Sequence, residues 1–106
     1  MSIVTFLGIE CDVVKKKYHA NQQTALQLFV ADTRANLDKG WSPGDPVLTA
    51  TSCLPDHCFK SGETAIKNYS ENEGILDVLL DAEIISSTGD FVASGYSLFP
   101  VVEVLI

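Results

Sequence analysis

Two cysteines and a histidine that lie close together are the first candidates for chemistry. Cys53, His57 and Cys58 have the spacing Cys-x3-His-Cys. A structural zinc site needs a full tetrahedral set of ligands, usually with roughly two to four residues between paired cysteines. The adjacent His57 and Cys58 are poorly placed to face one ion, and further ligands would have to be Cys11 or His19, from the other end of the chain. We therefore expect no metal, no cofactor and reduced thiols.

The same residues allow an alternative function, a small enzyme with Cys58 as nucleophile, His57 or His19 as base and a nearby carboxylate. Such a thiol needs an environment that favours the thiolate, and an oriented imidazole. Acidic surroundings disfavour the thiolate, and the chain has no Gly-x-Ser-x-Gly, glycine-rich phosphate loop or His-Glu-x-x-His motif. We therefore predict no catalytic residues, and the enzyme stays the alternative.

Three carboxylates recur at a spacing of four residues, namely Glu73, Asp77 and Asp81. On a helix these side chains lie one above another and repel each other by roughly 0.2–0.5 kcal/mol per pair. No lysine lies between them, whereas a face made only for solubility mixes charges of both signs. We interpret them as a docking face for a basic partner protein, of the inhibitor or charge-mimic type. The alternative is an ordinary solvated face of an acidic protein, and calcium would need a loop with alternating oxygen ligands.

Trp41 is a fourth candidate for contact with a partner. It lies in a Gly-Trp-Ser-Pro-Gly run, which is typical of a loop. A loop tryptophan can anchor a protein partner, or it can fold over the core of its own domain. Asn72 is interpreted as a residue of the first turn of the helix described below.

The net charge of −7 is distributed unevenly. All 7 basic residues lie at or before Lys67, together with half of the 14 acidic residues, and the segment after Lys67 has no lysine or arginine. Such a field repels phosphate groups, so we expect no direct nucleic-acid binding by this part. No apolar run reaches the roughly 20 residues that cross a bilayer, so we expect no membrane contact.

A chain of 106 residues, 46% hydrophobic and 20% charged, has the size and composition of one folded domain. The first residues lack the basic region and cleavage site of an export signal. Three cysteines are an odd number, which does not fit a domain with fully paired disulfides. We therefore expect a single cytoplasmic domain over residues 1–106.

The clearest local pattern predicts an amphipathic helix over about residues 71–83. Ser70 and Glu73 have the spacing of a capping box. Apolar residues then follow at helical spacing, namely Ile75, Val78, Leu79 and Ala82. The run Ser-Ser-Thr-Gly-Asp at 86–90 is expected to end the helix.

The rest of the chain predicts short strands. These are 3–9, continued by 11–18, then 46–54 and 63–69, with a turn at 21–23 and a loop containing one helical turn at 34–40. Residues 24–32 fit a strand or a helix, and we favour a strand because 46–54 supplies an antiparallel partner. Residues 91–99 and 101–106 form one bent strand or two short ones. The terminal segment is expected in a central strand or at an interface, where it allows a homodimer.

The predicted fold class is therefore α+β, a mainly antiparallel β-sheet with one amphipathic helix (about 71–83) packed on one face.

Several short motifs lie within residues 44–106 and together resemble those of a known family. They are Gly-Asp-Pro at 44–46, Ala-Thr at 50–51, Leu-Pro-Asp at 54–56, Ile-Lys-Asn-Tyr-Ser-Glu-Asn-Glu-Gly at 66–74, Thr-Gly at 88–89 and Ser-Gly-Tyr at 94–96. With these motifs the segment resembles a family of small uncharacterised proteins of phages, plasmids and integrated mobile elements. The resemblance implies an accessory protein of a mobile element, and it brings no activity, cofactor or site residue with it.

Overall fold

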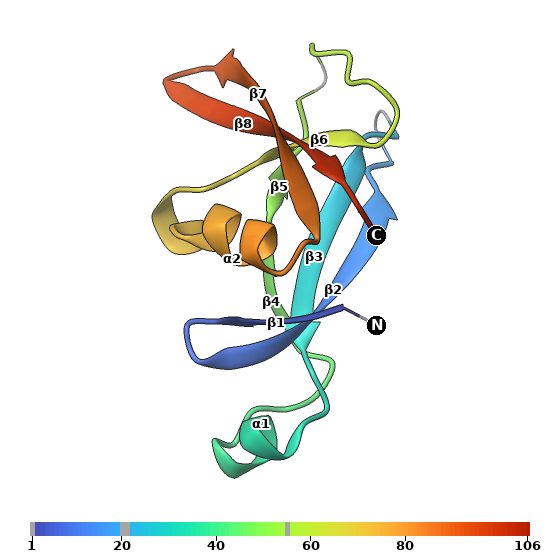
Figure 1. The fold of residues 1–106 in the computed structure, drawn as a ribbon. Coiled ribbons are helices and arrows are strands. Elements are labelled where there is room, and N and C mark those ends of the chain that lie inside the picture. Colours follow the sequence, from blue (N-terminus) through green and yellow to red (C-terminus); the bar gives the residue numbers. More distant parts are fainter. Residues whose placement is uncertain (1, 20–21, 55) are drawn as a thin grey trace.

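The computed structural model describes residues 2–19, 22–54 and 56–106, which form two four-stranded antiparallel sheets (Figure 1). The order is β1-β2-β3-β4 in the first sheet and β5-β6-β8-β7 in the second. This confirms the predicted α+β class with a mainly antiparallel sheet. The elements are β1 (Ser2–Phe6), β2 (Ile9–Lys17), β3 (Thr24–Val30), α1 (Arg34–Asp38), β4 (Pro46–Thr49), β5 (Thr51–Ser52), β6 (Glu63–Ile66), the 3-10 helix η1 (Ser70–Asn72), α2 (Ile75–Asp81), β7 (Ile85–Ser94) and β8 (Ser97–Val104).

The chain begins with a hairpin, where the sequence predicts a strand over 3–9 that continues into 11–18. Phe6 of β1 pairs with Ile9 of β2. The two turn residues between them, Leu7 and Gly8, have φ angles of +53° and +78°. Two positive φ angles are the pattern of a type I′ hairpin turn, whose twist matches that of the strands. The prediction that the first strand continues straight into 11–18 was wrong, because Gly8 accepts the positive φ angle with which the chain reverses.

One bent strand joins the two sheets. Only Ala50 separates β4 from β5. Its N–H donates to the Leu26 carbonyl (2.8 Å) in β3, and its carbonyl accepts from the Lys67 N–H (2.8 Å) after β6. The Thr64 hydroxyl of β6 also donates to the Thr24 carbonyl of β3 (2.7 Å). The sheets therefore roll around one core, and the predicted strands at 24–32 and 46–54 are confirmed as antiparallel partners.

Helix α2 lies between the two edge strands of this rolled sheet. It contacts β1 in the first sheet and β7 in the second. Ile75 and Leu79 are fully buried, because the spacing of four residues puts both on one side of the helix. They join the main core cluster, which includes Val4, Phe6, Leu26, Leu28, Ile66, Ile85 and Val102.

The helix is shorter than predicted, and the predicted capping box is not formed. Ser70 begins η1 with a φ of +58°, and the Glu73 N–H donates to the Ser70 main-chain oxygen instead of its hydroxyl. Gly74 then takes a left-handed conformation (φ +93°), which breaks a helix begun at 71. The actual cap is Asn68, whose Oδ1 accepts from the N–H groups of Gly74 (3.2 Å) and Leu76 (2.9 Å).

The last two strands form a hairpin that reaches past the rest of the second sheet (Figure 1). The sequence predicts the end of the helix at 86–90, but this segment lies in β7, with a register shift between Ser87 and Phe91. Gly95 (φ +60°) is in the turn. The described pairing of β8 with β6 extends from Glu103 to Val101. Pro100, which has no N–H to donate, lies just beyond it.

Strand β8 is central, as the sequence predicts, because it pairs with β6 on one side and β7 on the other. Val101 and Val102 are buried. Burial does not continue to the last residues, since Leu105 and Ile106 are exposed. A dimer sheet through β8 would require one of its two neighbours to leave first.

Candidate functional site

The structure keeps two of the three predicted carboxylates on one exposed helix face. Asp77 and Asp81 lie one turn apart on α2, and both are exposed. Glu73 is exposed too, but it lies before Gly74 and outside the helix. None of the three takes part in an ion pair in the described part of the chain. We call Asp77 and Asp81 the acidic edge.

A hollow of about 430 Å³ with a mixed polar and apolar lining adjoins α2 at Leu76. We call it the hairpin hollow, because most of its apolar wall comes from the β7–β8 hairpin. Leu76 precedes Asp77 on the helix, so the hollow and the acidic edge occupy neighbouring sides of α2. The hollow is lined by Asn68, Tyr69, Leu76, Phe91, Tyr96, Leu98 and Pro100, with Ser97.

The apolar wall faces solvent because one side of the hairpin is left uncovered. Phe91 pairs with Pro100, and Ala93 pairs with Leu98. Strand side chains alternate between the two faces, so these four side chains share a face. Phe91 is 60% exposed and Leu98 is 59% exposed. On the other face Phe99 is buried in a small second core.

Tyr69 is held at the rim of the hollow from two sides. Its ring lies 5.8 Å from that of Phe99, centroid to centroid, at a tilt of 58°. The Lys67 ammonium lies 5.5 Å from the centroid of the same ring, within the range of a cation–π contact. Tyr69 is nevertheless 40% exposed, which leaves part of its ring available to a ligand.

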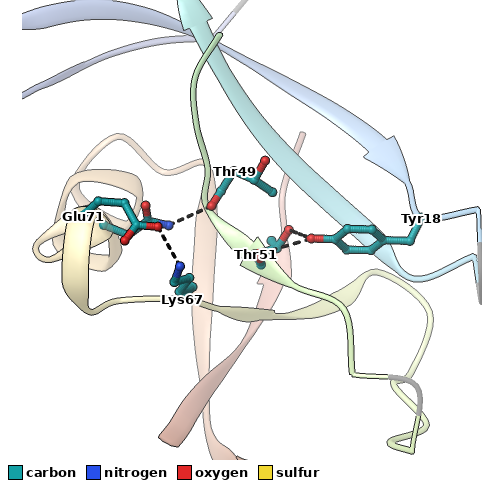
Figure 2. Close-up of polar contacts among 6 residues, drawn as sticks. Tyr18, Thr49, Thr51, Lys67 and Glu71 are labelled. Carbon is teal, nitrogen blue, oxygen red and sulfur yellow. Dashed lines mark hydrogen bonds and ion pairs between the residues drawn. The ribbon is translucent and has the colours of Figure 1, made fainter.

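The lysine nearest to this surface in the sequence is already paired (Figure 2). Lys67 Nζ donates to Glu71 Oε1 at 2.7 Å. This hydrogen bond is the main reason why the pKa of Glu71 falls to about 2, and it raises the pKa of Lys67. Glu71 thus neutralises the lysine, and the uncompensated charge around α2 is negative.

Asn72 has a structural role at the junction of η1 and β4. The side chain is buried, and its Nδ2 donates to the Thr49 carbonyl at 2.7 Å. The bond ties η1 to the end of β4. The expected place in the first helical turn was wrong, because Asn72 ends η1, and Glu73 and Gly74 separate it from α2.

Trp41 lies apart from the other predicted binding residues. It follows α1, and its main-chain N–H donates to the Asn36 carbonyl at 2.9 Å. Figure 1 shows α1 at the opposite end of the molecule from the β7–β8 turn. Trp41 is 43% exposed, so it does not fold over the core, but it belongs to a different surface.

Among the described residues, Cys58 is not paired with an imidazole. Cys58 is exposed, and no hydrogen bond joins it to an imidazole in the described part of the chain. The His57 ring instead packs edge-on against Phe59 at 4.5 Å. Cys11 is buried and donates to the Ile9 carbonyl (3.3 Å), and burial raises the pKa of its thiol. Among the described residues, no three His, Cys, Asp or Glu side chains gather where they could hold a metal.

Sequence reasoning missed the hairpin hollow altogether. The available signal was two short apolar runs, 91–93 and 98–100, on either side of Ser-Gly-Tyr-Ser. Apolar runs on either side of a turn predict a hairpin. The sequence does not reveal whether another element covers that face.

Comparison with known proteins found no matching family model, no matching curated protein and no matching solved structure. The resemblance of residues 44–106 to mobile-element proteins therefore stays a prediction. Within the described residues, no helix is long and apolar enough to span a membrane.

Proposed function

We propose that this chain is a non-enzymatic protein-binding module, which docks a partner segment carrying apolar anchors flanked by lysine or arginine. The single observation that carries the proposal is the position of Leu76. It lines the hairpin hollow and directly precedes Asp77 of the acidic edge. Apolar anchors would fill the hollow, and the flanking cations would approach Asp77 and Asp81.

The exposed wall of the hollow supplies the binding energy. Full burial of one large apolar side chain contributes about 1.5–3 kcal/mol. Phe91 and Leu98 still expose 60% and 59% of their surface, so covering both releases roughly 2–4 kcal/mol, from which the entropy cost of association is subtracted. The acidic edge adds attraction at long range and selects the partner by charge. This combination suits a reversible complex.

The charge of the surface argues for a basic protein and against a second copy or a nucleic acid. Residues 68–106 contain no lysine or arginine. Two copies docked through this surface would bring their acidic edges together, and phosphate groups would be repelled for the same reason. A basic nucleic-acid-binding protein is one partner of this kind, and the module would then inhibit it by occupying its phosphate-binding surface. With reduced thiols, the proposed compartment remains the cytoplasm.

A selection from a library of random peptides displayed on phage tests the proposal with a defined probe. We expect the enriched peptides to combine apolar residues with lysine or arginine. Phe91→Ser and the double variant Asp77→Lys, Asp81→Lys should each lower their affinity by at least about tenfold, or 1.4 kcal/mol. The charge variant should lose most at low salt, where screening is weakest.

Two controls separate binding from folding. Leu37→Ser changes an apolar side chain of similar exposure (53%) on the distant α1 and should leave peptide affinity unchanged. The Asp77→Lys, Asp81→Lys variant should melt at the same or a higher temperature, because a lysine at the C-terminal end of α2 interacts favourably with the helix dipole, whereas Asp81 does not. Enriched peptides that are acidic, or that lose as much affinity with Leu37→Ser, would contradict the proposal.

A further inference from the structure

A second surface, lined by lysines, lies on the opposite side of the molecule from α2. Lys15, Lys16 and Lys17 end strand β2, next to the loop that leads into β6. Two adjoining hollows of about 370 Å³ and 300 Å³ meet there and share Lys17, Thr24, Ser61 and Gly62. We call them together the lysine groove. Its charged lining comprises Lys15, Lys16, Lys17, Lys60 and Glu63, with His57 at one end.

One wall of the groove is the end of strand β2, which partly buried hydrogen bonds of Tyr18 hold in place. The Tyr18 hydroxyl lies 2.9 Å from Thr51 Oγ1 and 3.2 Å from the Thr51 carbonyl, which fixes the end of β2 against β5 (Figure 2). Burial is the main reason why the pKa of Tyr18 is raised, so this phenol stays protonated at neutral pH. The lysines that precede Tyr18 therefore start from an ordered backbone.

The loop wall is tied to the start of β3 by one glutamine side chain. Gln23 Nε2 donates to the carbonyls of Leu54 (2.7 Å) and His57 (2.9 Å), and its Oε1 accepts from the Leu54 N–H (2.8 Å). On the far side, the Gly62 carbonyl accepts from the Val104 N–H (2.8 Å). Both walls are thus part of the folded framework.

The groove carries a clear excess of positive charge. Glu63 is the one acidic residue in the lining, and its Oε1 accepts from the main-chain N–H of Lys60 (3.3 Å). Lys15 donates to the Ile106 main-chain oxygen (2.6 Å). Lys17 and Lys60 form no ion pair in the described part of the chain. Two cations therefore remain available to an anionic ligand at the point where the hollows meet.

We infer that the lysine groove binds the phosphate backbone of a single-stranded nucleic acid. Lys15 and Lys17 lie on the same side of β2 at a separation of about 7 Å along the strand, so they present charge in a row and not at a point. One aromatic side chain, Phe59, lines the groove beside the row. A basic groove next to aromatic side chains is how proteins bind single strands without sequence preference.

This inference departs from the sequence-based expectation of no direct nucleic-acid contact. That expectation came from the acidic segment after Lys67. Figure 1 shows α2 and the end of β2 on opposite sides of the molecule, whose two shorter dimensions are 23 Å. At physiological salt the Debye length is about 8 Å, so the field of the acidic edge is largely screened at the groove. The average charge of the chain hides two separate surfaces.

Fluorescence anisotropy with a labelled oligodeoxythymidine of about 12 nucleotides, within the site size of single-strand binding folds, tests the inference. With one phosphate contact each from Lys17 and Lys60, the plot of log K against log salt should have a slope of about −1.4. The double variant Lys17→Gln, Lys60→Gln should bring this slope close to zero. Glu63→Gln should tighten binding, because it removes the acid and keeps the oxygen that accepts from Lys60.

Lys39→Gln is the matched control, because it removes one exposed lysine whose Nζ contacts the distant Gly8 carbonyl (2.9 Å). It should leave the slope unchanged, and so should Phe91→Ser, which tests independence from the proposed protein-binding surface. Melting temperatures of all variants establish that each is folded. The inference is overturned if no binding occurs at low salt, if Lys39→Gln loses as much affinity as Lys17→Gln, or if duplex DNA or tripolyphosphate competes as well as the oligonucleotide.

Discussion

At the scale of single residues, buried asparagines position the short helices. Asn36 is fully buried and joins α1 to β2 through two hydrogen bonds and to Ala31, directly after β3, through a third. Its Nδ2 donates to the carbonyls of Glu10 and Ala31 (both 2.8 Å), and its Oδ1 accepts from the Glu10 N–H (3.1 Å). Asn68 has the corresponding role at the start of α2. Neither role follows from local spacing, because the partners of Asn36 include a residue 26 positions away.

Replacing Asn36 by alanine should destabilise the protein by about 2–4 kcal/mol, since three hydrogen bonds of about 1 kcal/mol each are lost and buried partners stay unsatisfied. Urea unfolding monitored by circular dichroism measures the change. Asp38→Ala, at an exposed position of the same helix, serves as control and should change stability by less than about 0.5 kcal/mol. A similar small effect of Asn36→Ala would show that α1 does not depend on this side chain.

The Lys67–Glu71 pair gives a prediction about pH. The pKa of Glu71 is lowered to about 2 in the folded protein, so the pair stabilises the fold above the unfolded pKa. That contribution should be lost progressively as the pH falls from about 4.5 towards 2. An NMR titration of the Glu71 side chain measures the midpoint directly. Lys67→Met should return the midpoint towards the ordinary range, and an unchanged low midpoint would assign the shift to another cause.

At the scale of elements, strands that have a pairing partner could be predicted from the sequence more reliably than the residues at which a helix begins and ends. Residues 24–32 were correctly assigned to a strand because 46–54 offered a partner. The helix start was missed because Ser70 and Glu73 fit a capping box locally, whereas Gly74 and Asn68 decide the actual start. The exposed positions of Asp77 and Asp81 could be predicted from helical periodicity. The hairpin hollow could not, because it depends on how far β7 and β8 extend past β6.

Two truncations of the C-terminal segment should behave differently. Removal of 101–106 deletes Val101 and Val102, which are 4% and 0% exposed and lie in the strand between β6 and β7. Their burial is worth roughly 3–6 kcal/mol, a large part of a typical domain stability of about 5–15 kcal/mol, so this product should be unfolded or aggregated. Removal of 105–106 should leave a cooperatively folded protein. Circular dichroism melting and sedimentation measure both, and a folded product without 101–106 would contradict the core assignment.

At the scale of the whole molecule, two surfaces of opposite charge lie on different sides of one rolled sheet. The C-terminal part supplies the acidic edge and most of the hairpin hollow, while β2 and the loop before β6 supply the lysine groove. Sequence composition predicts the charge imbalance along the chain. It does not predict the separation in space, which arises because the bent strand at 46–52 carries the chain from one sheet to the other.

The proposed docking of a basic, apolar protein segment in the hairpin hollow can be mapped by an NMR titration of the isotope-labelled protein with an enriched peptide, in which backbone amide shifts are followed residue by residue. We expect the largest shift changes at Tyr69, Leu76, Tyr96 and Leu98, and we expect the amides of 15–17 and 60–62 to stay unchanged. Shift changes centred on the lysine groove or on α1 instead would contradict it.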